Sequence, residues 1–302
     1  MNKPPDLVGG GAATSELSAA VKATVLCEAL PYIRRYLGKI LVVKYGGNAL
    51  ASAVTDEAAL RLFAEDVVLL RSVGMLPVVV HGGGPQIGAL MERLGKVPEF
   101  RDGLRVTDAD TLDIARMVLV GKVNRDIVGA INAHGPLAVG LSGEDAGLIT
   151  AEPRDPALGY VGDIVSVDTR ILDRLLAEGL VPVVATIGTD EAGQVYNINA
   201  DTVAGAIAEA LTAEKLLFLT DVPGIRHSAS DAGSLVTELT PGELEDLVSS
   251  SAVSDGMLPK AAACVSAVRG GVGSAHVLDG REQHALLLEL LTPEGVGTMV
   301  AE

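Results

Sequence analysis

Short apolar runs alternate along the chain with stretches in which apolar residues recur every three or four positions, and this alternation predicts an α/β fold. The apolar runs indicate buried strands at residues 40–43, 76–80, 137–141, 180–185, 215–220, 274–278 and 298–300. The helical spacing indicates helices at residues 56–71, 86–94, 108–120, 123–133, 169–178, 202–211, 241–249 and 283–291. Strands that alternate with helices form βαβ units, so we expect a mainly parallel sheet with functional loops at its carboxyl edge.

The first residues differ from the rest of the chain. Residues 1–20 are rich in Pro, Gly, Ala and Ser and have no apolar period, so we expect a mobile tail. Residues 21–38 carry an apolar stripe on one helical face, and Pro31 is expected to kink that helix. Such a helix could pack on its own domain or on another subunit, and both interpretations stay open. The remainder divides into two halves, residues 39–190 and 191–302.

Segments rich in turn-forming residues predict hairpins. Residues 96–107 place Asp102-Gly103 between short extended pieces, and we expect this hairpin to hang over the carboxyl edge of the sheet. Residues 148–167 are expected to form another hairpin, because prolines and glycines interrupt any helical pattern there. Residues 226–237 are expected to form a third, variable hairpin.

Composition and charge narrow the class of protein. The chain has 302 residues, of which 48% are hydrophobic, and this is enough for a large core. A formal net charge of −16 argues against nucleic-acid binding or an acidic membrane surface. No apolar run approaches the roughly 18 residues that span a bilayer, and the start lacks the apolar core of a secretion signal. Cys27 and Cys264 have no metal-ligand spacing, so we expect a cytoplasmic protein without a metal site of its own.

Candidate chemistry begins where the first two predicted strands end. Lys44 follows the first strand and precedes, after Tyr45, the pair Gly46-Gly47, and the second strand leads into the glycines 82–84. Glycine loops at the ends of neighbouring parallel strands would turn backbone N–H groups toward one anion. A lysine at the end of a buried strand either faces such an anion or extends past the sheet edge to solvent. The second glycine loop favours the anion.

Polar residues elsewhere in the chain are candidates for a site at the same carboxyl edge of the sheet. Arg105 is either a surface arginine or a clamp for a carboxylate, and its position in the hairpin alone favours the surface. Asn197, Asn199 and Asp201 precede a helix, for which one of them would suffice as the cap. Lys260 lies in the first turn of a helix that ends at residue 268, where the helix dipole disfavours a cation unless a polyanion is bound.

Six motifs together carry a resemblance to a known family. They are KYGGNAL at 44–50, HGGGPQI at 81–87, DGLRVTD at 102–108, NINADTVA at 197–204, LTDVPGI at 219–225 and SDGMLPK at 254–260. In this combination they resemble the N-acetyl-L-glutamate kinases of the amino acid kinase family, over about residues 25–300. The chain has no Walker A pattern, no GxGxxG before a helix and no GxSxG, which argues against P-loop enzymes, dinucleotide dehydrogenases and triad hydrolases.

The resemblance implies a three-layer αβα sandwich around a mainly parallel sheet, with an amino-acid-binding lobe at residues 39–190 and an ATP-binding lobe at 191–302. It implies transfer of the γ-phosphoryl group of ATP, carried with Mg²⁺, to the side-chain carboxylate of N-acetyl-L-glutamate in arginine biosynthesis. A carboxylate with a pKa of about 4.3 is ionised at neutral pH, so this nucleophile needs no general base.

The same resemblance implies roles for individual residues. Lys44 and Lys260 would stabilise the transferring phosphoryl group, and Asp201 would hold the two lysines apart. The implied substrate-binding residues are Gly83, Gly84, Arg105, Asn197 and Asn199, which favours the clamp for Arg105. The implied ATP-binding residues are Gly46, Gly47, Asp221, Gly224 and Ser254.

The helix at residues 21–38 resembles the extra N-terminal helix of arginine-inhibited members, which interlaces dimers into a hexameric ring. His276, Glu289 and Gly295 resemble the arginine ligands of that branch in type and spacing, although each also fits an ordinary turn, helix surface or loop. We therefore expect a homohexamer, a trimer of dimers, that L-arginine inhibits.

Other members of the wider family remain alternatives, namely glutamate 5-kinase, carbamate kinase, aspartokinase and uridylate kinase. A non-catalytic sensor of arginine or nucleotide with the same fold is another. The Arg105 hairpin and the NINAD motif favour an acceptor that carries a carboxylate, whereas the acetyl preference rests on the resemblance alone. The presence of Lys44, Lys260 and Asp201 argues against the sensor.

Overall fold

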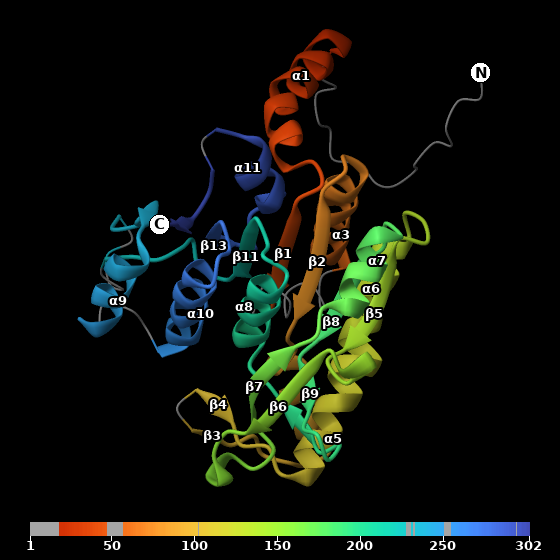
Figure 1. Ribbon diagram of the computed structural model, residues 1–302, viewed down its shortest axis with the longest axis vertical. Helices are drawn as coiled ribbons and strands as arrows, with labels where there is room; N and C mark the ends of the chain where they lie inside the picture. Colours follow the sequence, from red (N-terminus) through yellow and green to blue (C-terminus); the bar gives the residue numbers. More distant parts are fainter. Residues whose placement is uncertain are drawn as a thin grey trace.

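The computed structural model describes residues 18–46, 57–101, 103–227, 231, 233–250, 255–293 and 295–302. Over these residues the backbone forms an eight-stranded central sheet, a four-stranded sheet and a two-stranded hairpin (Figure 1). Among the helices in the described ranges, none is long and apolar enough to cross a membrane. The tail predicted at residues 1–20 lies outside the described residues as far as residue 17.

The central sheet contains β1 (Ile40–Tyr45), β2 (Leu76–His81), β5 (Ala138–Ser142), β8 (Val181–Ala185), β11 (Lys215–Thr220), β12 (Glu238–Leu239), β13 (Ser274–Asp279) and β14 (Thr298–Val300). The smaller sheet contains β6 (Ile149–Pro153), β7 (Gly162–Val167), β9 (Ile187–Thr189) and β10 (Val195–Asn197), and the hairpin contains β3 (Phe100–Arg101) and β4 (Leu104–Arg105). The α-helices are α1 (Ala19–Tyr36), α3 (Glu57–Ser72), α4 (Gly84–Arg93), α5 (Ala109–Arg116), α6 (Asn124–Asn132), α7 (Arg170–Ala177), α8 (Ala200–Ala210), α9 (Pro241–Ser249), α10 (Leu258–Arg269) and α11 (Ala285–Leu291).

The central sheet has the order β12-β14-β13-β11-β1-β2-β8-β5. Within the described part of this sheet, every neighbouring pair is parallel except β13 and β14. The carboxyl ends of parallel strands lie at the same edge of a sheet. The loops that follow β1, β2 and β11 are therefore at one edge. The predicted mainly parallel sheet is confirmed.

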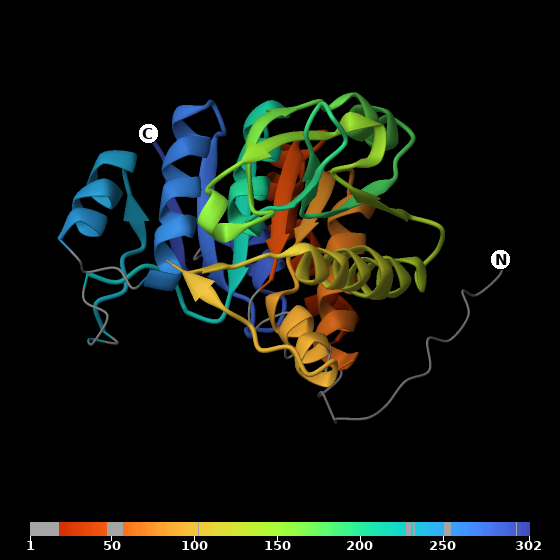
Figure 2. The same cartoon turned by 90° about the horizontal axis from the view of Figure 1, so that it is seen from below.

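Alternate residues of the central strands enter two separate cores. In β1, Leu41 and Val43 pack in the core that contains residues of α3, α6 and α11, whereas Val42 packs with residues of α8 and α10. Figures 1 and 2 show the helices covering both faces of the sheet. The three-layer αβα sandwich is therefore confirmed. Because side chains alternate along a strand, Lys44 shares the face of Val42 and points toward α8.

Two details of the sequence-based prediction were wrong. The break predicted between residues 120 and 123 does not occur, because a π-helical turn, Met117–Val123, joins α5 to α6. Burial of Val118 and Leu119 in the core stabilises this turn across Gly121. The short strands β9, β10 and β12 were not predicted. The hairpins at 96–107 and 148–167 are present as the antiparallel pairs β3–β4 and β6–β7.

Candidate active site

Three buried charged side chains meet on the α8 face of the central sheet. Nζ of Lys44, near the end of β1, lies 2.9 Å from Oδ1 of Asp201, and Nζ of Lys260, in the first turn of α10, lies 3.0 Å from Oδ2. Lys44 is 7% exposed, Asp201 8% and Lys260 6%. The structure thus brings together the three residues predicted to be catalytic, with one carboxylate between two ammonium groups.

The helix starts explain how Asp201 and Lys260 reach this position. Asn199 caps α8, and its Oδ1 accepts hydrogen bonds from the backbone N–H groups of Asp201 and Thr202. The positive end of the α8 dipole favours the Asp201 carboxylate. The same dipole effect at α10 disfavours the Lys260 ammonium, which is compensated by its contact with Asp201.

The electrostatics of this cluster favour an anion. Burial alone would raise the pKa of the Asp201 carboxyl, but the charges of Lys44 and Lys260 outweigh burial and lower the pKa to about 2. Burial and the charge of Lys44 lower the pKa of Lys260, whereas Asp201 opposes that shift. Lys260 Nζ also lies 4.9 Å from the centroid of the Phe218 ring. Two ammonium groups share one carboxylate, so their excess positive charge can stabilise a polyanion.

The two glycine loops meet beside this cluster. The Gly82 N–H donates to the carbonyl oxygen of Tyr45 at 3.4 Å. A Cβ on Gly46 would lie 2.8 Å from both Cε and Nζ of Lys44, and a Cβ on Gly82 would lie 3.3 Å from the Cβ of Ala200. Glycine therefore lets both loops approach the charged cluster closely. Gly47 lies outside the described residues.

Arg105 is not the solvated surface arginine that its position in the hairpin alone favoured. Its Nη2 donates to the carbonyl oxygen of Gly84 at 2.9 Å, and its guanidinium carbon lies 4.7 Å from the centroid of the Phe100 ring. Burial lowers the pKa of this guanidinium. The structure therefore places a half-buried cation beside the glycine loop of α4.

The two predicted asparagines lie at the end of β10 and at the start of α8. Asn197 Nδ2 donates to the hydroxyl of Thr107 at 3.3 Å, which joins β10 to the end of the Arg105 hairpin. Asn199 is the cap of α8 and also lines a cavity.

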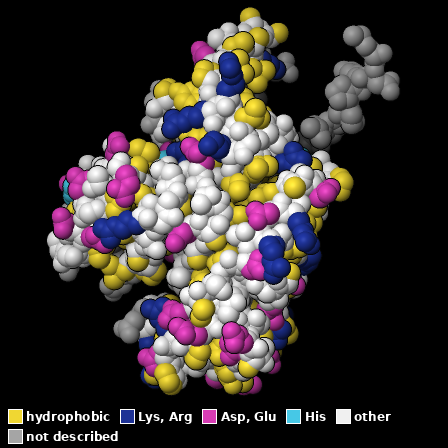
Figure 3. All heavy atoms as spheres, viewed as in Figure 1, with side chains coloured by type: hydrophobic (Ala, Val, Ile, Leu, Met, Phe, Trp, Pro, Cys, Tyr) yellow, Lys and Arg dark blue, Asp and Glu magenta, His cyan; other side chains and the backbone are white. Residues whose placement is uncertain are grey.

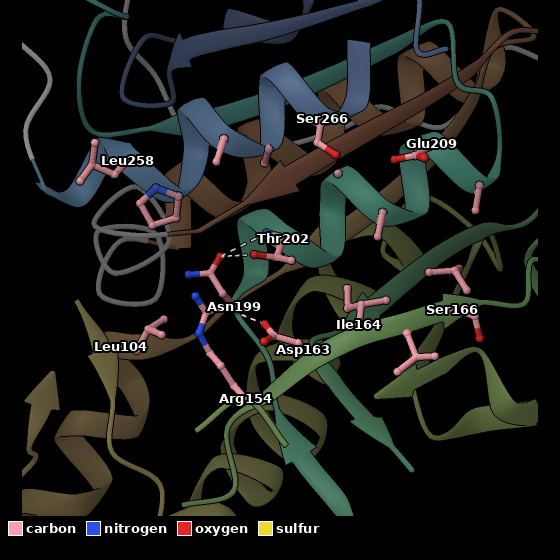
Figure 4. Close-up of a pocket in the computed structure, with 18 of the residues that line it drawn as sticks. Leu104, Arg154, Asp163, Ile164, Ser166, Asn199, Thr202, Glu209, Leu258 and Ser266 are labelled. Carbon is pink, nitrogen blue, oxygen red and sulfur yellow. Dashed lines mark hydrogen bonds and ion pairs between the residues drawn. The ribbon is translucent and has the colours of Figure 1, made fainter. Parts of the chain in front are cut away.

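This cavity has a volume of about 1060 Å³ and lies between β4, β7, α8 and α10 (Figure 4). Leu104 borders it from the hairpin, whereas Leu258 and Pro259 border it from α10. It therefore extends up to the helical turn that carries Lys260. A volume of this size exceeds that of most small-molecule sites, which reach about 1,000 Å³.

The structure gives a packing reason for one predicted ATP-binding residue. Gly224 has a φ of 152°, and a Cβ there would lie 2.6 Å from the hydroxyl oxygen of Thr298. That hydroxyl accepts a hydrogen bond from the N–H of Ile225 at 2.8 Å. Asp221 directly follows β11 at the carboxyl edge, and its ATP-binding role stays a prediction. Ser254 lies outside the described residues.

A second cluster of charged side chains contains the three residues predicted to bind arginine. His276 Nδ1, on β13, lies 2.7 Å from Oε1 of Glu289, on α11. Glu289 Oε2 accepts a hydrogen bond from the Val296 N–H at 2.8 Å, and a Cβ on Gly295 would lie 3.1 Å from that oxygen. The three predicted residues thus lie together, with Glu289 of α11 between His276 of β13 and the loop at Gly295.

Sequence reasoning missed two members of this second cluster. Lys215 Nζ lies 2.8 Å from His276 Nε2 and 3.9 Å from Glu289 Oε1, and 5.7 Å from the centroid of the Tyr36 ring on α1. Burial lowers the pKa of Lys215 to about 8, although Glu289 opposes the shift. The signal that identified Lys44, a lysine at one end of a buried apolar strand, is equally present at Lys215.

Within the described part of the chain, no group of three His, Cys, Asp or Glu side chains is arranged to hold a metal ion. Any Mg²⁺ in the site would therefore be held mainly by phosphate oxygens and water, as is usual for this ion.

Comparisons with known proteins agree with the fold. The model of the amino acid kinase family matches residues 39–279. An acetylglutamate kinase of Saccharopolyspora erythraea is 55% identical over 290 residues, which are 94% of this chain and 94% of that protein. An acetylglutamate kinase of Symbiobacterium thermophilum is 52% identical over 290 residues, covering 93% of this chain and 98% of that protein.

Two solved structures extend this comparison. The N-acetylglutamate synthase of Neisseria gonorrhoeae, solved with coenzyme A and L-arginine, has a TM-score of 0.79 and 29% identity, covering 92% of this chain and 65% of that one. The carbamate kinase of Giardia lamblia, bound to AMP-PNP, has a TM-score of 0.67 and 16% identity, covering 88% of this chain and 99% of that one. The second similarity concerns the fold alone.

Proposed function

Because the chain belongs to the amino acid kinase family, and within it to the acetylglutamate kinases, it is a kinase, and we propose that it phosphorylates the side-chain carboxylate of N-acetyl-L-glutamate with ATP in arginine biosynthesis. The observation that carries this proposal is the arrangement of Lys44 and Lys260 around Asp201 beside two glycine loops. We propose that the reaction takes place in the cytoplasm.

The chemistry of carboxyl phosphorylation accounts for these residues. The acceptor carboxylate is already ionised, so the main difficulty is to bring two anions together and to stabilise charge on the moving phosphoryl group. Lys44 and Lys260 supply that charge, and the N–H groups of the glycine loops add donors. Asp201 has only acceptor oxygens and so does not bind phosphate directly; its role is to hold the two ammonium groups apart.

The remaining predicted residues are assigned by position. Residues 39–190 would form the lobe that binds N-acetyl-L-glutamate, with Arg105 on its α-carboxylate. Gly83 and Gly84, together with Asn197 and Asn199 from the second lobe, would complete the substrate pocket. Residues 191–302 would form the ATP lobe, with Asp221, Gly224 and Ser254 at the nucleotide, and Gly46 and Gly47 would reach the nucleotide from the first lobe. The Mg²⁺ bound to ATP would neutralise part of the phosphate charge.

The test is ADP formation from MgATP with N-acetyl-L-glutamate or with L-glutamate, in the wild type and in Lys44→Ala. We expect turnover with the acetylated substrate alone and its loss in the variant. Equal turnover of free glutamate would favour glutamate 5-kinase activity instead. A folded protein that turns over neither substrate would support the sensor or a different acceptor.

We further propose that L-arginine inhibits the enzyme at the cluster of His276, Glu289 and Gly295. The Glu289 carboxylate could accept two parallel hydrogen bonds from a guanidinium, and such charged bonds contribute about 1.5–3 kcal/mol each. Glu289→Gln is therefore expected to raise the arginine concentration for half-inhibition at least about tenfold at unchanged kcat. The exposed Glu191→Gln is the matched control. A wild type that stays active at millimolar arginine would remove this proposal.

We propose that α1 joins copies of the chain into a hexamer, a trimer of dimers. Its apolar side chains are exposed, with Val25 51% and Leu26 69% accessible, and hydrophobic side chains gather over this projecting helix in Figure 3. Leu26→Asp is expected to shift the mass measured by light scattering from a hexamer toward a dimer, because a charge would be buried at the contact. Val97→Asp, at an 87% exposed residue elsewhere, should leave the mass unchanged.

A further inference from the structure

A chain of hydrogen bonds runs from Arg125 to the glycine loop after β2. The Arg125 guanidinium donates to Oδ1 of Asn124, whose Nδ2 donates to the carbonyl oxygen of Val183 at 2.8 Å. The same Nδ2 lies 3.1 Å from Nε2 of His81, and Nδ1 of His81 lies 3.0 Å from the carbonyl oxygen of Gly82. His81 and Asn124 are both 0% exposed. Neither side chain belongs to the proposed substrate, ATP or arginine sites.

These contacts fix the tautomer of His81. A carbonyl oxygen can only accept, so Nδ1 carries the proton and donates to Gly82. Nε2 is then the acceptor for the amide of Asn124. Burial lowers the pKa of His81 to about 4, which keeps the imidazole neutral at pH 7. Every bond in the chain thus has a defined donor and acceptor.

The bond to Gly82 also sets the direction of the next N–H group. In a planar trans peptide the C=O of Gly82 and the N–H of Gly83 point in opposite directions. The alternation along β2 places His81, with Val79, on the α6 face of the sheet, so the Gly82 carbonyl turns toward that layer. The Gly83 N–H then points toward the α8 face, where Asp201 lies.

The helical segment that carries Asn124 also packs against the glycine loop. A Cβ on Gly83 would lie 2.8 Å from Cδ2 of Leu119 and 3.3 Å from Cγ2 of Val123, both in the π-helical turn that precedes Asn124. Turns of this type often mark functional sites. Without such contacts, a peptide between two glycines could rotate freely.

We propose that His81, held by Asn124, is a positioning residue for phosphoryl transfer, because it aims the Gly83 N–H at the charge that develops on the phosphoryl group. This inference rests on the proposed kinase reaction. His81 touches no substrate and acts through the backbone. A preoriented donor stabilises the transition state more than the bound substrate, so its loss should lower kcat more than it raises KM.

The test compares two substitutions, each of which replaces one of the two imidazole nitrogens with a side-chain amide. In His81→Asn the amide nitrogen can take the place of Nδ1–H, whereas in His81→Gln the amide reaches the place of Nε2. We expect His81→Asn to keep kcat within about threefold and His81→Gln to lower it about 30-fold or more, with KM for N-acetyl-L-glutamate nearly unchanged in both. Equal kcat values in the two variants, or a loss that appears in KM, would overturn the proposal.

Two further measurements separate positioning from folding and from the proposed function. Thermal unfolding reports whether each variant folds, and if the His81 variants do not fold, Asn124→Ala replaces them, with kcat expected to fall about tenfold at constant KM. Calorimetric binding of aluminium fluoride with MgADP and N-acetyl-L-glutamate needs no turnover. That complex should weaken in His81→Gln and not in His81→Asn, while MgADP alone binds equally to both.

Discussion

Replacing Lys260 with methionine is expected to lower kcat about 1,000-fold, while KM for N-acetyl-L-glutamate changes less than about threefold. Lys260 is 6% exposed and its ammonium contacts Asp201 at 3.0 Å, so the charge is desolvated and already oriented before the reaction begins. A preoriented charge in a site of low polarity stabilises developing negative charge far more strongly than a solvated one. Methionine keeps the length of the side chain and its packing near Phe218, so the change removes mainly the charge.

Lys122→Met is the matched control for this experiment. Lys122 is a 56% exposed lysine that pairs with Asp126 one helical turn away, at 3.0 Å. Its replacement removes the same charge from the same type of side chain and should leave kcat within about twofold, because exposed pairs contribute little. Initial rates of ADP formation at saturating ATP measure both variants. A kcat in Lys260→Met that stays within tenfold of the wild type would contradict the role proposed for this lysine.

The positions of the main strands along the chain could be predicted from the sequence, because the central strands are buried on both faces. Such strands read as continuous apolar runs, and those of β1 and β11 stand out clearly. The short strands β9 and β10 could not be predicted, because pairing with neighbouring strands, rather than an apolar run of their own, stabilises them. The π-helical turn was not predicted for a similar reason, because tertiary packing overrides the tendency of glycine to end a helix.

The candidate site was predictable wherever a residue is anomalous in its own segment. Lys44 and Lys260 stand out because a buried strand end and a helix start are unfavourable places for a cation. Arg105 is not anomalous within its own segment. It contacts the Gly84 carbonyl and the Phe100 ring, which bury it, only when the hairpin is folded. The contact of His81 with Asn124 joins residues 43 positions apart, and only the three-dimensional structure brings the two side chains together.

Asp201→Asn is expected to lower the free energy of unfolding by about 3 kcal/mol and to abolish most turnover. The variant keeps the size of the side chain but leaves Lys44 and Lys260 buried with no counter-charge, and two like charges then repel each other in a site of low polarity. Urea unfolding at pH 7 measures the change. Asp66→Asn is the control, because Asp66 is also buried but contacts His284 rather than the two lysines. Its expected loss is smaller, since burial raises the pKa of Asp66 to about 6.

The acid dependence of stability provides a second test of the same variant. The pKa of Asp201 is about 2 in the folded protein against the usual 3.8, so its stabilising effect is complete above pH 4 and disappears as the pH falls toward 2. This difference corresponds to about 2 kcal/mol, which Asp201→Asn should remove from the acid limb of the stability curve. A polyanion can replace the missing charge, so MgATP should raise the melting temperature of the variant more than that of the wild type. Equal shifts in both proteins would mean that the nucleotide phosphates do not reach the two lysines.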